Sequence, residues 1–341
     1  MTAADGSGSV PVATLTSTDR VLDDFAAEVG DVGPVAIEGC RTRWQLGGPP
    51  AEGTRFLTAP TGIVDYKPDE MTVTVRAGTL VSELHAALAE RGQRTALVDR
   101  SGTVGGALVV GENDVRALGR GLIRTSVLQV RYVSAEGRII SSGGPTVKNV
   151  SGFDLPRLMV GSLGTLGLLA EVIIRTNPIP ATSRWLTASG VDPQPVYDAL
   201  LAPGAVLWDG TNTWVELEGH RVDVDAEHRK LAPIGTFTEV PTAGDGLPMP
   251  LPDHRWSMTP AEVLELGQQP TNPDHGFPEA EAGPGSDPGP FVAAVGLGLV
   301  FGHNRQPARK VVPEIEVVAA RLKENFDPAG RLNPGRDPGR K

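Results

Sequence analysis

The chain has 341 residues, enough for two domains that each bury a hydrophobic core. Its 41 acidic residues outnumber its 31 lysines and arginines, and the resulting net charge of −10 argues against a nucleic-acid-binding protein, because such proteins present a basic face. Cys40 is the only cysteine, which excludes an internal disulfide and a cysteine-based metal site and favours a reducing, cytoplasmic compartment.

The chain shows no sequence signal for a membrane or for export. No apolar run reaches the roughly 20 residues that span a bilayer, so we expect no direct membrane span. The N-terminus lacks a basic region followed by an apolar stretch, and residues 1–9 are predicted to be a disordered tail. The 42 glycines and 30 prolines favour a loop-rich enzyme over a helical bundle.

Residues 10–178 are predicted to alternate helices and strands. The pattern predicts helices over 20–29 and 80–91, strands over 34–38 and 72–76, and a hairpin of 126–133 with 138–140. Residues 148–167 read KNVSGFDLPRLMVGSLGTLG, in which a short helix is followed by three regularly spaced glycines and then by a strand over 168–174. A glycine-rich turn of this kind lets the backbone approach a ligand or another segment of backbone.

The residues after 178 differ from the first part in composition and in their predicted elements. Residues 179–308 are predicted to form a smaller α+β domain, with strands over 214–218 and 222–225 and a mobile, proline- and glycine-rich loop over 267–290. Residues 309–341 are predicted to contain a helix over 313–325 and a tail that includes Asp327 to Gly335.

Four segments occur in one order along the chain: 39–43, 101–106, 148–167 and 327–335. Together they resemble the FAD-binding domain shared by vanillyl-alcohol oxidase and the FAD-linked 2-hydroxyacid dehydrogenases. Within that superfamily the segments 62–70 and 148–154 are most similar to the small FAD-binding subunit (E subunit) of bacterial glycolate oxidase. The resemblance is strong over about residues 15–178, clear over the last 25 or so, and weak in the middle.

The resemblance implies an α+β fold. A two-subdomain PCMH-type FAD-binding domain would occupy 10–178, a small α+β cap domain resembling a substrate domain would occupy 179–308, and the C-terminal helix and tail over 309–341 would return to the flavin.

The FAD diphosphate needs backbone N–H groups and positive charge, and the first segment supplies both, since Gly39 and Thr42 give a tight loop and Arg41 and Arg43 add cations. The resemblance identifies this segment as the pyrophosphate loop and Thr103 to Gly106 as a second wall. Each of these features also has a purely structural alternative. The loop could be an ordinary turn, the second wall a β-bulge, and the glycines at 161–167 could serve packing alone. Asn333 is either a flavin ligand or a turn residue. The expected cofactor-binding residues are Gly39, Cys40, Arg41, Thr42, Arg43, Ser101, Thr103, Val104, Gly105, Gly106, Gly111, Arg124, Gly164, Gly167 and Asn333.

The pyrophosphate loop lacks the histidine that usually attaches the flavin covalently in this superfamily, so noncovalent FAD is expected. Two positions depart from the family pattern: Asp114 replaces a glycine and is expected to face water, and Thr125 follows Arg124 where an aspartate is usual.

Oxidation of a 2-hydroxy acid requires a base, a cation for the carboxylate, and a substrate hydride aimed at flavin N5. His303 is the candidate base, and Arg116 and Arg124 are the candidate carboxylate ligands; a surface histidine and salt-bridged arginines are the alternatives. The sequence lacks the HxGDGNxH-type segment of the larger glycolate oxidase subunit, and its six histidines show no metal-ligand spacing.

Two functions follow from the resemblance. The chain is either a flavoenzyme subunit that takes a hydride from a small 2-hydroxy acid such as glycolate or D-lactate, or a non-catalytic FAD-holding scaffold subunit. In either case a larger flavin subunit and an iron–sulfur subunit are the expected partners. We expect the chain itself to be cytoplasmic and to reach the inner membrane only through such a partner. A flavin reductase of the cell-wall amino-sugar type shares the fold, but the tail Leu332-Asn333-Pro334-Gly335 argues against it.

Overall fold

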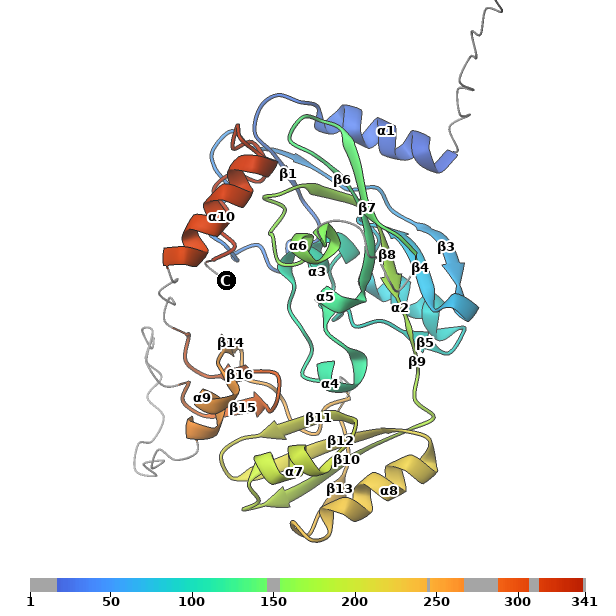
Figure 1. The fold of residues 1–341 in the computed structure, drawn as a ribbon, viewed down its shortest axis with the longest axis vertical. Coiled ribbons are helices and arrows are strands. Elements are labelled where there is room, and N and C mark those ends of the chain that lie inside the picture. Colours follow the sequence, from blue (N-terminus) through green and yellow to red (C-terminus); the bar gives the residue numbers. More distant parts are fainter. Residues whose placement is uncertain (1–16, 146–153, 244–245, 267–287, 307–312, 340–341) are drawn as a thin grey trace, which may run out of the picture.

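The computed structural model describes residues 17–145, 154–243, 246–266, 288–306 and 313–339. Two sheets organise these residues, one above the other in Figure 1. The predicted disordered tail, the Lys148 to Phe153 segment and most of the 267–290 loop lie outside the described residues.

The first sheet has five strands in the order β3-β4-β8-β6-β7, and every neighbouring pair is antiparallel. Its central strand β8 is buried along almost its whole length, as its run of leucine, isoleucine and valine predicts. The strands are β3 (Ile63–Lys67), β4 (Thr72–Arg76), β6 (Val127–Val133), β7 (Ile139–Gly143) and β8 (Leu168–Arg175). The predicted strands and hairpin of this part are confirmed.

Helices and two small sheets surround the first sheet. Each predicted helix is confirmed within a few residues at its ends, and Leu22, Leu84 and Leu108 carry apolar helix faces into one core with the strands. The helices are α1 (Ser17–Val29), α2 (Val81–Ala89), α3 (Val104–Val110), α5 (Ile123–Ser126) and α6 (Leu155–Met159), with the 3-10 turn η1 (Pro68–Glu70). The small sheets pair β1 (Val35–Ile37) in parallel with β2 (Arg55–Leu57), and β5 (Gln93–Arg94) with β9 (Asn177–Pro178).

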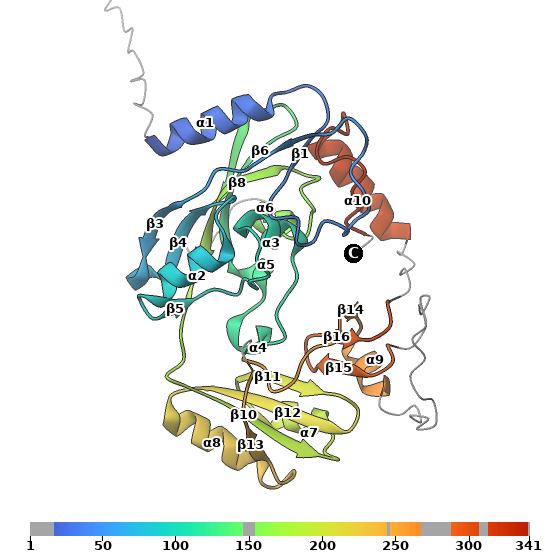
Figure 2. The ribbon, with the colours of Figure 1, turned by 180° about the vertical axis from the view of Figure 1, so that it is seen from behind.

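The second sheet has seven strands in the order β13-β10-β12-β11-β15-β16-β14, all antiparallel. They are β10 (Thr182–Ser189), β11 (Pro203–Trp208), β12 (Asn212–Gly219), β13 (Thr238–Val240), β14 (His254–Ser257), β15 (Phe291–Ala294) and β16 (Leu299–Gly302), with helices α7 (Pro193–Ala199), α8 (Arg221–Leu231) and α9 (Pro260–Glu265). The short helix α4 (Ala117–Arg120) extends from the first part down to this sheet (Figures 1 and 2).

One predicted strand is wrong. Residues 222–225 belong to helix α8, although their alternation of valine and aspartate is typical of a half-buried strand. Val222 is 75% exposed, whereas Val224 and Leu231 are buried. These two buried residues are seven positions apart, or two helical turns, so the helical period decides the element.

The end of the chain returns to the first part. Helix α10 (Pro313–Phe326) leads into a segment in which Leu332 forms a parallel bridge with Val35. Arg331 is buried and donates hydrogen bonds to backbone carbonyls of the α1–β1 region, among them those of Gly30 and Gly33. This anchoring places the last residues beside the loop that follows β1. Within the described residues, no helix is long and apolar enough to cross a bilayer.

Candidate functional site

A cavity with an empty volume of about 860 Å³, its open mouth included, lies where the loop after β1, helix α3 and the C-terminal tail meet. A second hollow of about 440 Å³ shares Ile37, Gly39, Thr103, Gly106, Val109, Leu163 and Asn333 with it. The two therefore form one elongated site. Its inner end is apolar and glycine-lined, with Ala59, Ala77, Gly164 and Leu169, and its outer end carries the charged side chains.

Two chain segments come close together at the centre of this site. Thr103 caps α3, and its hydroxyl accepts a hydrogen bond from the backbone N–H of Gly106 at 3.1 Å. A Cβ atom on Gly39 would lie 2.9 Å from that hydroxyl oxygen. Glycine at position 39 therefore lets the loop after β1 approach the start of α3, and both segments expose backbone to the cavity.

The cavity is strongly basic in an acidic protein. Four arginines line it (Arg41, Arg43, Arg100 and Arg336), against one lining carboxylate, that of Glu112. Glu112 lies 3.0 Å from Arg43 and 3.4 Å from Arg100. Arg41 is 2.6 Å from Glu38, outside the lining set. Two positive charges therefore remain, which matches a dianion such as a diphosphate.

The backbone at this site is unusual. Arg41, Leu163 and Asn333 all line the cavity and all have positive φ, at 56°, 52° and 44°. Residues other than glycine rarely adopt a positive φ, and those that do concentrate at ligand sites. The Asn333 side-chain amide donates to the backbone carbonyl of Leu163, which holds two of them together.

The regularly spaced glycines serve both packing and the cavity. Gly161 packs against Gly111, where a Cβ on Gly111 would lie 3.1 Å from the Gly161 backbone. A Cβ on Gly167 would lie 2.3 Å from the Tyr132 ring, so this glycine is required by packing. Gly164 and Gly167 also line the inner end of the cavity. The architectural interpretation of this block thus holds alongside its place in the site.

The structure gathers most of the predicted cofactor-binding residues around the cavity. Its lining includes Gly39, Cys40, Arg41, Thr42, Arg43, Thr103, Gly105, Gly106, Gly164, Gly167 and Asn333. Ser101, Val104, Gly111 and Arg124 lie outside the lining set. Sequence reasoning missed Trp44, Leu46, Arg100, Glu112, Leu163 and Arg336, which also line it. The sequence signal that could have found Arg336 is its position directly after the predicted Asn333-Pro334-Gly335 segment.

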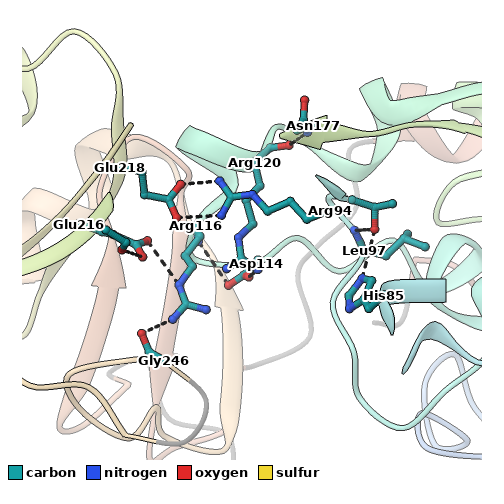
Figure 3. Close-up of polar contacts among 12 residues, drawn as sticks. His85, Arg94, Leu97, Asp114, Arg116, Arg120, Asn177, Glu216, Glu218 and Gly246 are labelled. Carbon is teal, nitrogen blue, oxygen red and sulfur yellow. Dashed lines mark hydrogen bonds and ion pairs between the residues drawn. The ribbon is translucent and has the colours of Figure 1, made fainter. Parts of the chain in front are cut away.

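The predicted catalytic residues lie elsewhere. His303 is exposed just after β16, and Arg124 is exposed on α5. Arg116 is buried between the two sheets, where it is 3.4 Å from Glu216 and donates to the carbonyl of Gly246 (Figure 3). None of these three is among the described residues that line the cavity. Their proposed roles stay predictions.

Arg116 belongs to an ion-pair cluster between the two sheets (Figure 3). The two terminal guanidinium nitrogens of Arg94, Nη1 and Nη2, donate to the carboxylate of Glu218, at 2.8 and 2.5 Å. Asp114 lies 3.1 Å from Arg120 with its side chain 16% exposed, so the expectation that Asp114 faces water is wrong. The pairing with Arg120 draws it inward.

The two glutamates of this cluster differ in acidity. Burial, then the charge of Glu218, raises the pKa of Glu216 to about 7, although Arg116 opposes the shift. Burial alone would also raise the pKa of Glu218, but the hydrogen bonds and charge of Arg94 outweigh it and lower that pKa. Among the described residues no group of histidines and acids is arranged to hold a metal ion.

Comparisons with known proteins agree with the cavity. Residues 34–143 match the family model described as an FAD-binding domain. The chain is 34% identical over 170 residues to glycolate oxidase subunit GlcE of Escherichia coli, covering 49% of each chain. It is 32% identical over 160 residues to glycolate oxidase subunit GlcD of Bacillus subtilis, covering 46% of this chain and 34% of that one.

The fold also matches a solved structure of an alkyldihydroxyacetonephosphate synthase, with a TM-score of 0.60 and 13% identity, over 92% of this chain and 73% of that one. At that identity the likeness concerns the fold alone. The alignment with GlcE spans about half of that relative's length. Residues 34–143 contribute the loop after β1, α3 and Glu112 to the cavity, so this part of the chain is an FAD-binding domain, with FAD as its cofactor.

Proposed function

We propose that this chain is the FAD-binding subunit of a heteromeric oxidoreductase that oxidises a small 2-hydroxy acid of the glycolate or D-lactate type. The observation that carries the proposal is the elongated, basic cavity with its two uncompensated positive charges. Among the similar proteins are two glycolate oxidase subunits and a D-lactate dehydrogenase of Archaeoglobus fulgidus, 47% identical over 76 residues that cover 22% of this chain and 17% of that one.

The residues present fit FAD. Gly39 to Arg43 and Thr103 to Gly106 would hold its diphosphate with backbone groups and charge, and the inner hollow with Gly164 and Gly167 would hold an apolar ring. When bound, FAD would accept the hydride of the 2-hydroxy acid at N5. The pyrophosphate loop holds Cys40 and contains no histidine, so we propose noncovalent attachment. A larger flavin subunit and an iron–sulfur subunit are the proposed partners for onward electron transfer.

A non-catalytic, FAD-holding role is the second candidate. Arg116, the predicted ligand of the substrate carboxylate, is already paired with Glu216 between the sheets. A substrate would have to displace that buried carboxylate to use this cation, and breaking such a pair is costly. The catalytic step would then occur on a partner chain.

The two candidates are separated by anaerobic titration of the purified, FAD-loaded chain with glycolate and with D- and L-lactate. Substrate oxidation would bleach the visible absorbance band of the oxidised flavin, because the hydride reduces the ring. Bleaching by one acid supports catalysis by this chain. An FAD-loaded chain that dithionite reduces but no acid bleaches is the scaffold subunit, and a chain that takes up no FAD contradicts both candidates.

A further inference from the structure

Arg336, in the C-terminal tail, has a distinctive set of contacts at the cavity. Its Nη1 group donates to the backbone carbonyls of Trp44, Leu46 and Gly48, which all belong to the loop after β1. The guanidinium carbon lies 4.7 Å from the centre of the Trp44 ring, within the range of a cation–π contact. The Nη1 group and one face of the guanidinium are therefore committed to the protein.

The other side of this guanidinium has no partner in the described part of the chain. Nε and Nη2 make no hydrogen bond there, and no carboxylate forms an ion pair with Arg336. Arg41, Arg43 and Arg100 each have a carboxylate within 3.4 Å, that of Glu38 or Glu112. Burial lowers the pKa of Arg336 and no acidic group opposes the shift, as expected of a half-buried cation without a counter-ion.

The tail holds Arg336 in place independently of that cation. The backbone N–H of Ala51 donates to the Pro334 carbonyl at 2.8 Å, and that of Asp337 donates to the Gly47 carbonyl at 2.8 Å. Gly335 packs on the loop so closely that a Cβ atom would lie 2.5 Å from the Pro49 carbonyl oxygen. The tail and the loop are thus locked together on both sides of Arg336, which presents the guanidinium as part of the cavity wall.

We propose that Arg336 is a phosphate-binding residue of the FAD site, so that the C-terminal tail supplies one of the two positive charges that meet the cofactor diphosphate. This inference rests on FAD as the cofactor and not on the reaction catalysed. The planar edge formed by Nε and Nη2 suits two oxygens of a diphosphate, and the bond is charge-assisted. The carbonyl bonds of Nη1 fix the orientation of that edge.

The test isolates the diphosphate by comparing two ligands that differ in it. The affinities of ADP and adenosine for the FAD-free protein are measured by competition against FAD binding, for the wild type and for Arg336→Gln. We expect the preference for ADP over adenosine to fall by about tenfold to a hundredfold in the variant, the range for loss of a hydrogen bond to a charged group. Arg336→Lys, which keeps the charge but not the planar edge, should retain an intermediate preference.

Arg55→Gln is the matched control, because Arg55 also donates to two backbone carbonyls, those of Glu28 and Val29, but does not line the cavity. Its ratio of ADP to adenosine affinity should equal that of the wild type. A purely structural role for Arg336 would weaken both ligands equally and leave the ratio unchanged, which would overturn the proposal. A wild-type chain that binds no FAD would instead contradict the cofactor assignment itself.

Discussion

The buried carboxyl of Glu216 makes the stability of the protein depend on pH. Its pKa is raised from 4.5 to about 7, chiefly by burial and then by the charge of Glu218, while Arg116, Ser183 and Arg120 oppose the shift. Between these two values the folded state keeps a proton that the unfolded state has lost. The free energy of unfolding should therefore fall as pH rises from about 4.5 to about 7, and level off above.

Glu216→Gln removes this titration, and the fall in unfolding free energy between pH 5 and pH 8 should shrink by about 1–3 kcal/mol. Urea unfolding at several pH values measures it, and the difference between variant and wild type cancels the other titrating groups. Glu218 does not mask the effect, because its lowered pKa places its own loss of stability at lower pH. Equal pH dependence in both proteins would contradict the assignment.

At the residue scale, the sequence predicted the segments that form the cavity better than it predicted the individual charged residues of the site. Gly39, Thr103 and Asn333 lie in segments whose composition marks them, and all three line the cavity. Arg336 donates hydrogen bonds to the backbone carbonyls of Trp44 and Leu46, about 290 positions earlier in the chain. Nothing in the local sequence around Arg336 reveals that contact. Arg116 was instead predicted as a substrate ligand, whereas in the structure it pairs with Glu216. That pairing depends on how the two sheets meet, which the sequence does not show.

At the scale of elements, the turn between α6 and β8 depends on the missing side chain of Gly167. A methyl group there would lie 2.3 Å from the ring of Tyr132, which is itself buried in strand β6. We expect Gly167→Ala to destabilise the protein by about 1–3 kcal/mol, because overpacking forces the strand and the turn apart. Urea unfolding with FAD bound and with FAD removed measures this cost.

Gly144→Ala is the control, since a Cβ atom at Gly144 meets nothing within 4 Å and its φ is not positive. That variant should change stability by no more than about 0.5 kcal/mol. A Gly167→Ala protein that unfolds like the wild type would show that the block is not architectural. A loss confined to the FAD-bound form would assign the glycine to the cofactor instead.

The elements themselves were predictable where hydrophobic periodicity and turn residues agree. Strand β4 occupies residues 72–76 as predicted, because alternating β-branched residues there face one core. Residues 222–225 failed because four residues of valine and aspartate satisfy a strand pattern, and only the later Leu231 reveals the helical period of α8. Short windows carry too few buried positions to separate the two periods.

At the scale of the whole molecule, the ion-pair cluster of Figure 3 holds the two sheets against each other. Arg94 lies in β5 beside the first sheet and Glu218 lies in β12 of the second, and their side chains are only 18% and 8% exposed. Helix α4 adds a close backbone contact, since a Cβ on Gly119 would lie 2.9 Å from the Cα atom of Gly204. Cooperative unfolding of the two parts should therefore depend on this junction.

Glu218→Gln should split thermal unfolding of the FAD-loaded chain into two transitions. The substitution leaves the guanidinium of Arg94 buried without its counter-ion, which costs about 3–5 kcal/mol at the junction and little within either sheet. Differential scanning calorimetry resolves the transitions. Asp225→Asn is the matched control, because it removes the partner of Arg184 (2.8 Å apart) wholly within the second part. One unchanged transition in Glu218→Gln, or the same splitting in Asp225→Asn, would show that the two parts are held together by contacts other than this cluster.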